Sequence, residues 1–195
     1  MKKVSFTAME NGTQEDFVML YTLANQATRN VSGRILEALE PVKTSFDGYQ
    51  VNRYEHSLQT ATRAYRNGES EEMVVAALLH DIGDHLAPYN AGEMAAAILR
   101  PYVSEKTYWI VKHHSLFQKY YWGHYLGENR NEREKYREHP YYQATVDFCE
   151  NYDQNSFDPN YDSLPIKFFE PFVKKIFRHP QVAYQFVQML ENQNQ

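Results

Sequence analysis

Apolar positions recur along most of the chain with the three-to-four-residue period of amphipathic helices, and short stretches with Gly, Pro or Asn separate the periodic segments. Thr13 and Asp16 are spaced as in a capping box, which predicts a helix that starts after Thr13. Ser70 and Ser104 are expected to cap two later helices. After a second helix with Ile35, Leu36 and Leu39, the expected helices cover about 53–66, 71–84, 92–99, 105–114, 131–138, 140–152, 167–178 and 180–192.

The segment 71–84, EEMVVAALLHDIGD, is apolar on nearly every face. A helix of this kind is buried, so we expect it at the centre of the fold. No stretch alternates between apolar and polar residues as a half-buried strand does. The sequence therefore predicts an all-α protein, and its 195 residues suit one domain, 1–195.

Composition narrows the expected partners. The formal net charge of −5, with lysines and arginines scattered among acids, argues against nucleic-acid binding. No apolar run approaches the roughly 18 residues that span a bilayer, and the first residues lack the apolar region of a signal peptide. We expect a cytoplasmic protein whose partner is a small molecule. A single cysteine, Cys149, excludes an internal disulfide and a Cys-rich zinc site, and we interpret it as a buried apolar residue.

The dipeptide His80-Asp81 is the strongest local chemical signal, because it ends the buried apolar helix. Burying an imidazole beside a carboxylate is costly unless something compensates both groups. A divalent metal would do so, since imidazole nitrogen and carboxylate oxygen are both ligands. A buried His–Asp hydrogen bond is the alternative, and the dipeptide alone leaves both open.

Three further potential ligands come from other predicted helices. His56 lies on the preceding helix, His114 follows His113 at the end of a later apolar helix, and Asp153 follows an aromatic segment. Helices that project His and Asp side chains inward are a common way to build a metal site in a bundle. His124, His139 and His179 lack such a pattern, so we interpret them as surface or packing residues.

The ordered set of ligands, with the motif LLHDIG, resembles the HD-domain superfamily over about residues 50–160. Most members of this superfamily are metal-dependent phosphohydrolases. The resemblance implies a single HD-domain helical bundle in which His56, His80, Asp81 and Asp153 hold one metal. It also implies that Asp81 bridges to a second metal held by His114.

A narrower resemblance involves the pieces GYQVNRYEHSLQ, LLHDIGDHLAP, HHSLFQKYYW and YDQNSFD. They are similar to the HD-domain oxygenases, which include myo-inositol oxygenase and hydroxyphosphonate dioxygenases. This resemblance implies two irons that activate O2 toward a C–H bond beside a hydroxyl, and it favours His114 over His113 as the ligand.

The chain departs from that branch at one ligand position. The oxygenases have a further histidine about ten residues after the HD pair, and Ala91 stands there in this sequence. Three explanations remain open: His85 or Glu93 substitutes as a ligand, the site holds one metal, or the histidine was deliberately replaced.

Four residues near the expected ligands are candidates for contact with substrate. Asp84, three residues after Asp81, would suit a cationic group, and the resembling enzymes carry a basic residue there. Lys119, with Gln118 beside it, would hold an anionic group such as a phosphonate. Tyr49 lies where the resembling enzymes place a residue that closes over the metals. Ordinary surface or packing roles are the alternative for Asp84, Lys119 and Tyr49.

Three functions follow from this pattern. The first is a non-haem iron oxygenase that uses O2 to oxidise and cleave a small hydroxylated compound, such as a hydroxyphosphonate with an amino or trimethylammonio group. The second is a phosphohydrolase of a small phosphoester or nucleotide that uses Mn, Mg or Zn to activate water. The third is an inactive HD module that binds a ligand, which only Ala91 supports.

Overall fold

The computed structural model describes residues 3–178 and residue 180, and within them there is no β-strand. The all-α prediction is therefore confirmed for the described chain. Eight α-helices follow in this order: α1 (Gln14–Thr28), α2 (Val31–Ala38), α3 (Arg53–Arg66), α4 (Glu71–Leu79), α5 (Ala91–Leu99), α6 (Glu105–Trp122), α7 (Tyr142–Phe148) and α8 (Ile166–Ile176). The helix expected over 180–192 lies outside the described residues.

Local capping explains where several helices begin. The Thr13 hydroxyl accepts a hydrogen bond from the amide of Asp16, whose side chain accepts from the Thr13 amide, so the predicted capping box of α1 is present. Asn52, Ser70 and Ser104 cap α3, α4 and α6 in the same manner, each through its side-chain oxygen. These caps place the helix starts at fixed points relative to the chemically important residues.

Four predicted helices differ clearly from the structure in extent or type. The helix expected over 105–114 continues to Trp122 as α6. The segment expected to be helical over 131–138 forms only a 3₁₀ helix, Glu132–Tyr136. The helix expected from 140 begins at Tyr142 and passes into a π-helical turn, Cys149–Asp153. The central helix ends at Leu79 instead of continuing to residue 84. Turns follow this helix, and they direct both buried side chains of the HD pair toward the neighbouring helices.

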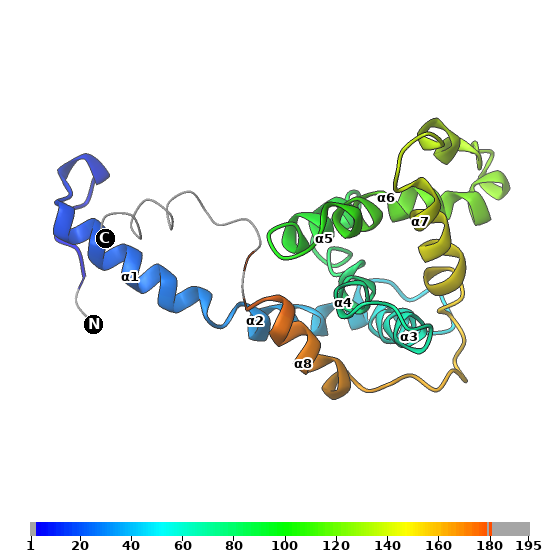
Figure 1. Cartoon of the computed structure of the whole chain (residues 1–195), viewed down its shortest axis with the longest axis horizontal. Coiled ribbons are helices and arrows are strands. Elements are labelled where there is room, and N and C mark those ends of the chain that lie inside the picture. Colours follow the sequence, from blue (N-terminus) through cyan, green and yellow to red (C-terminus); the bar gives the residue numbers. More distant parts are fainter. Residues whose placement is uncertain (1–2, 179, 181–195) are drawn as a thin grey trace.

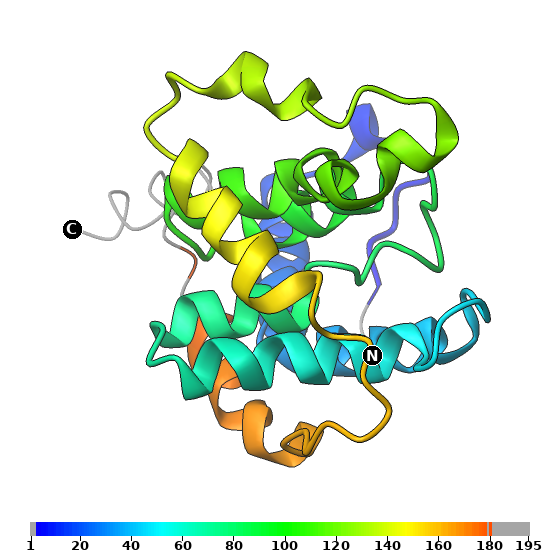
Figure 2. The ribbon, with the colours of Figure 1, turned by 90° about the vertical axis from the view of Figure 1, so that its right-hand side faces the viewer.

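The body of the molecule is built from two helix pairs. α3 packs along α4, and α5 packs along α6. α7 and the π-helical turn lie against both pairs, through α6 and α3, and Figure 2 shows α7 crossing in front of them. α8 covers α4 and α2. In α4, every residue from Met73 to Leu79 is buried, which confirms the prediction of a central apolar helix.

α1 stands apart from this body, as Figure 1 shows, and has no buried residue. Among the described residues, none of the helices has the length and apolar character required to cross a bilayer.

Candidate metal centre

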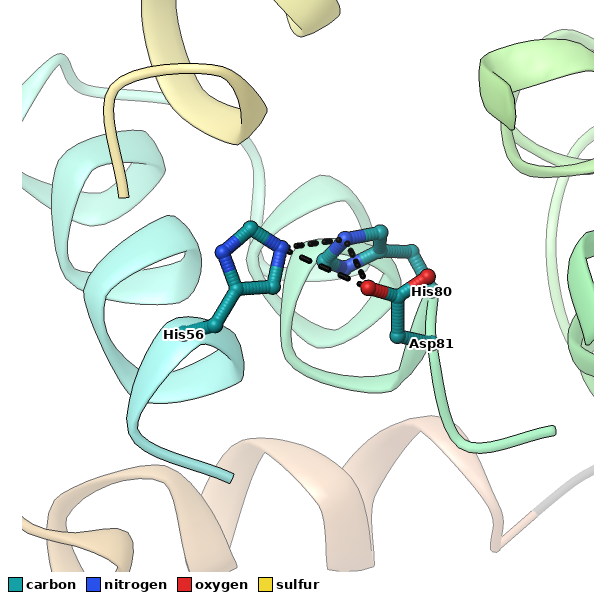
Figure 3. Close-up of side chains that lie close together, drawn as sticks. All are labelled: His56, His80 and Asp81. Carbon is teal, nitrogen blue, oxygen red and sulfur yellow. Dashed lines mark hydrogen bonds and ion pairs between the residues drawn. The ribbon is translucent and has the colours of Figure 1, made fainter. Parts of the chain in front are cut away.

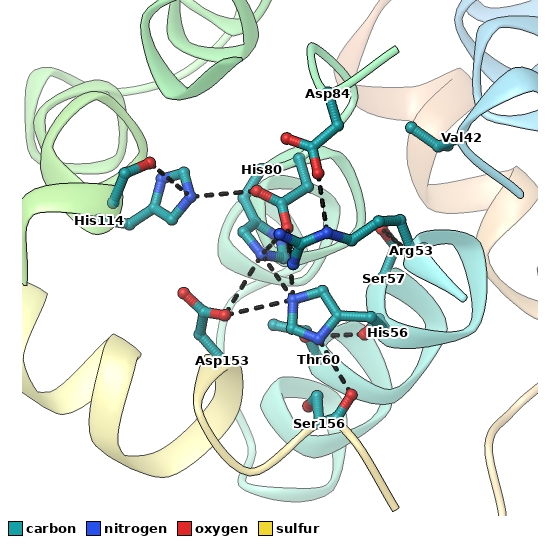
Figure 4. A network of polar contacts seen from close by, with 12 residues as sticks. Val42, Arg53, His56, Ser57, Thr60, His80, Asp84, His114, Asp153 and Ser156 are labelled. Atoms are coloured by element: carbon teal, nitrogen blue, oxygen red, sulfur yellow. Dashed lines mark hydrogen bonds and ion pairs between the residues drawn. The ribbon is translucent and has the colours of Figure 1, made fainter. Parts of the chain in front are cut away.

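Four elements bring the five predicted ligands together at the centre of the body (Figure 4). His56 lies in the first turn of α3, and His80 follows the last residue of α4 as its C-cap, with Asp81 directly after it. His114 lies in α6, and Asp153 ends the π-helical turn. Their exposed fractions range from 0% to 6%. The HD pair reaches the centre because α4 stops at Leu79, so that both side chains leave the end of the same helix.

Each of the three histidines donates its Nδ1 proton to a backbone carbonyl. The acceptors are Ser156 at 2.9 Å from His56, Ala77 at 2.7 Å from His80 and Val111 at 2.6 Å from His114. A carbonyl oxygen can only accept, so the proton of each neutral ring belongs on Nδ1. The three Nε2 atoms keep their lone pairs, which is how metal-binding histidines are oriented in proteins, and that of His114 can accept from Ser115 Oγ at 3.2 Å.

These lone pairs converge with carboxylate oxygens (Figure 3). His56 Nε2 lies 3.1 Å from His80 Nε2. Asp153 Oδ1 is 3.2 Å from the first nitrogen and 3.5 Å from the second, and Asp81 Oδ2 is 3.4 Å and 3.3 Å from them. Four acceptors that face one another in a buried space repel unless a cation lies between them. Asp153 Oδ2 is also buried with no hydrogen-bond partner among the described residues. The donor set therefore fits a metal ion.

Protons take the place of that cation in the metal-free chain. Burial alone would lower the pKa of His80, but the Asp81 and Asp153 carboxylates outweigh it and raise that pKa well above 6.5. The pKa of His56 is raised for the same reasons. Burial alone would raise the pKa values of Asp81 and Asp153, but His80 and the neighbouring imidazoles hold both below 3.8.

The second metal position implied by the resemblance is less complete. Asp81 Oδ1 points away from the first group of ligands and lies 3.2 Å from His114 Nε2. Ala91 is buried in the same cavity wall, but its methyl group cannot ligate a metal. His85 is exposed and does not belong to the wall, whereas Glu93 is exposed at it. The structure therefore brings Asp81 and His114 to this position, and ligand atoms of His80 and Asp153, which also face the first position, lie within 4.8 Å of one on His114.

A cavity of about 1090 Å³ opens above the ligands and is bordered by Asp81, His114 and Asp153. The predicted substrate residues Tyr49, Asp84 and Gln118 also line it. Lys119 is not among the lining residues, because it is ion-paired with Glu128 at 2.7 Å and Glu132 at 3.1 Å. The structure thus does not bring Lys119 to the site, and its charge is already compensated.

Arg53 is the site residue that sequence reasoning missed. Its Nη1 lies 3.2 Å from Asp81 Oδ2, its Nε lies 2.8 Å from Asp84 Oδ2, and its guanidinium lies over the Tyr49 ring. Burial and the charge of Asp81 raise the pKa of Asp84 to about 6, although Arg53 opposes the shift. The available signal was spacing, because Arg53 precedes His56 by three residues and therefore shares its helix face.

Aromatic rings close one side of the centre. Phe157 stacks on His56 with ring centroids 4.5 Å apart and on Tyr49 at 4.4 Å. Phe157 was also not predicted as a site residue, although it lies in the same segment as Asp153. Its ring shields the His56 imidazole from solvent.

The remaining histidines that the structure describes lie outside the ligand cluster. His113 donates to the Trp109 carbonyl and stacks on the Trp109 ring, which also stacks on His139. His124 is exposed against Tyr125. His179 lies outside the described residues.

Two matches with known proteins bear on the family of this chain. A profile of the HD domain family matches residues 53–153, just over half of the chain. A protein from Leisingera caerulea, named as a (1-hydroxy-2-(trimethylamino)ethyl)phosphonate dioxygenase (glycine-betaine-forming), is 47% identical over 47 residues. This alignment covers 24% of this chain and 24% of that protein, so the chain spans about a quarter of the length of this curated relative.

Proposed function

The chain belongs to the HD domain family, and we propose that within this family it is an iron-dependent oxygenase of a small hydroxylated compound. The observation that carries the proposal is the convergence of His56 Nε2, His80 Nε2 and the Asp81 and Asp153 carboxylates in a buried space. Two histidines with carboxylate ligands and open positions are typical of non-haem Fe(II) oxygenases. The dioxygenase of Leisingera caerulea supports this assignment over the matched segment.

Iron would supply the redox chemistry with O2, while the protein holds and orients the substrate. The Nδ1 hydrogen bonds of His56 and His80 would keep both imidazoles aimed at one point. Tyr49 and Phe157 would exclude water on one side, because their rings stack next to His56. The chain's own residues therefore provide a fixed ligand set under a lined cavity.

We further propose a zwitterionic substrate, such as a hydroxyphosphonate with an amino or trimethylammonio group. Asp84 and Arg53 present both signs of charge at the cavity wall, and Lys112 adds a cation. Tyr121 and Trp122 add aromatic surface, which attracts a quaternary ammonium group. Lys112 thereby replaces Lys119 as the candidate for contact with an anionic group, because Lys119 is paired with two glutamates and Arg53 with two aspartates.

A phosphohydrolase is the second candidate, favoured by the incomplete second metal position at Asp81 and His114. One divalent metal suffices to lower the pKa of a bound water and to polarise a phosphoryl oxygen. This chemistry requires neither iron nor O2. The inactive module is a weaker third proposal, because the five buried ionisable ligands are costly to retain without a metal.

The test measures O2 uptake and phosphate release on the same preparation. Protein reconstituted with Fe²⁺ without air is given a panel of hydroxyphosphonates in an oxygen electrode, and protein loaded with Mn²⁺ is given phosphoesters. We expect substrate-dependent O2 uptake that Asp81→Ala abolishes and that Asp162→Asn, at an exposed carboxylate, leaves unchanged. Phosphate release without O2 uptake would replace the oxygenase with the hydrolase, and metal binding without either activity would indicate the inactive module.

A further inference from the structure

The Asp81 and Asp84 carboxylates already have a cation between them. Arg53 spans the two, with Nη1 3.2 Å from Asp81 Oδ2 and Nε 2.8 Å from Asp84 Oδ2. Its side chain is 21% exposed, and those of Asp81 and Asp84 are 8% and 17% exposed. Charges this well buried interact more strongly than charges in water, so this ion pair is a fixed part of the centre. Figure 4 shows the guanidinium beside the ligand cluster.

We propose that this centre holds a single divalent metal and that Arg53 supplies permanently the positive charge that a second metal would bring. The inference rests on the metal-binding part of the proposed function, but it holds equally for an oxygenase and for a hydrolase. Of the three explanations left open for Ala91, the inference selects the one in which the site holds one metal.

Ligand supply is the first argument. The first position has four protein ligands, namely His56, His80, Asp81 and Asp153. The second has Asp81 Oδ1 and His114 Nε2. Ligand atoms of His80 and Asp153 lie within 4.8 Å of one on His114, but both residues already serve the first position. A catalytic zinc site, for comparison, keeps about three protein ligands of its own. The described wall residues add no free anionic ligand, because Ala91 lacks a donor atom, Glu93 is exposed and Asp84 is paired with Arg53. Ser115 offers a neutral hydroxyl 3.2 Å from His114 Nε2.

Charge balance is the second argument. Asp81, Asp84 and Asp153 bring three negative charges into the buried centre. Arg53 and one divalent ion bring three positive charges, so the centre is neutral with one metal. A second divalent ion would leave two uncompensated positive charges in a space of low dielectric constant, where such an excess is strongly unfavourable. Neutrality is therefore reached at one metal because Arg53 is present.

The test counts metal ions, with Mn²⁺ as the probe. Mn²⁺ per chain is measured after equilibrium dialysis, and electron paramagnetic resonance distinguishes an isolated ion from a spin-coupled pair. We expect one ion per chain and an isolated-ion spectrum for the natural sequence and for Ala91→His. Adding Arg53→Gln to Ala91→His should raise the count about twofold and produce the coupled spectrum, because the double variant has a third ligand and lacks the competing charge.

Two matched variants separate charge from shape. Ala91→His with Arg53→Lys keeps the positive charge and should bind one Mn²⁺ per chain. Ala91→His with Arg66→Gln alters an exposed arginine of the same helix and should also bind one Mn²⁺ per chain. Two ions in the natural sequence, two in Ala91→His alone, or one in the Arg53→Gln double variant would each overturn the inference. A folded natural protein that binds no Mn²⁺, Fe²⁺ or Zn²⁺ would instead remove the proposed metal-dependent function itself.

Discussion

The turn that carries the HD pair is packed directly on the start of α5, and Gly83→Ala tests this contact. A Cβ atom at residue 83 would lie 2.5 Å from the Ala91 carbonyl oxygen, 2.9 Å from its Cα and 3.1 Å from its carbonyl carbon. Ordinary contacts between such atoms begin near ~3.5 Å. All three obstacles are backbone atoms, so rotation of a side chain cannot relieve the overlap. The start of α5 must move by roughly 1 Å away from Asp81 and Asp84.

The size of the effect follows from two opposing contributions. Overpacking of this kind costs about 1–3 kcal/mol. Gly83 does not have a positive φ, so alanine can adopt its backbone conformation. Alanine also restricts the unfolded chain, which stabilises the folded state by about 0.4–1 kcal/mol. With each contribution near the middle of its range, the free energy of unfolding should fall by about 1–2 kcal/mol. In a chain of this size, that corresponds to a decrease in Tm of roughly 2–8 °C.

Thermal unfolding followed by circular dichroism, together with Mn²⁺ titration, measures both consequences. Gly33→Ala is the matched control, because a Cβ atom there would meet only the exposed Asn30 side chain, which can rotate away. The control should unfold at or above the temperature of the natural protein and should bind Mn²⁺ normally. Gly83→Ala should unfold at a lower temperature and bind Mn²⁺ more weakly. If Gly83→Ala is as stable as Gly33→Ala, the close approach between the HD turn and α5 is not what fixes the centre.

Four further predictions concern the metal and the buried groups around it. Removal of metal with a chelator should lower Tm by roughly 5–11 °C relative to protein at 100 times the dissociation constant, and Asp153→Asn should abolish most of this difference. Mn²⁺ affinity, measured by titration at several pH values, should fall as the pH is lowered from about 8 to 6, because the raised pKa of His80 makes the metal compete with a proton; a flat profile would contradict this. Metal-free protein should lose the stability contributed by His80 as the pH rises through its raised pKa, and should lose that contributed by Asp81 as the pH falls toward its lowered pKa. The Cys149 thiol, whose pKa burial raises well above 9.0, should react with a thiol reagent only after unfolding, and fast labelling of the native protein would refute its burial.

The parts of the fold that depend on local sequence were predictable. Arg53–Arg66 is the helix that the pattern indicated, because its apolar stripe and the Asn52 cap act within a few residues. The end of α4 was not predictable to the residue, since EEMVVAALLHDIGD continues its helical pattern beyond Leu79. The π-helical turn before Asp153 also has no local signal, because such turns are set by packing against neighbouring elements.

Charge partners were the main failure of sequence reasoning. Arg53 and Asp81 are 28 residues apart, so only the packing of α3 against α4 brings them together. Lys119 was expected at the substrate cavity, but the chain after α6 folds back and brings Glu128 and Glu132 to its ammonium group. In both cases a partner distant in the sequence decided the role of the charged residue.

The three histidines differ in how their orientation is achieved, and this difference divides the centre into a local part and a tertiary part. His80 and His114 donate their Nδ1 protons to carbonyls three residues earlier, so each ring is fixed within its own segment. His56 instead donates to the Ser156 carbonyl, 100 residues away.

The same short segment, 153–157, supplies Asp153 as a ligand and Phe157 as the ring stacked on His56. The first ligand in the sequence is therefore oriented by the segment that carries the last one. It follows that substitutions which displace 153–157 should weaken the metal site by two routes at once, through loss of the Asp153 carboxylate and through release of the His56 ring. Displacement of α5 would instead act mainly on the side of His114, because Gly92 in α5 lies against that imidazole. His56 and His114 thus respond to different parts of the chain, and Asp81, with one carboxylate oxygen facing each imidazole, lies between them.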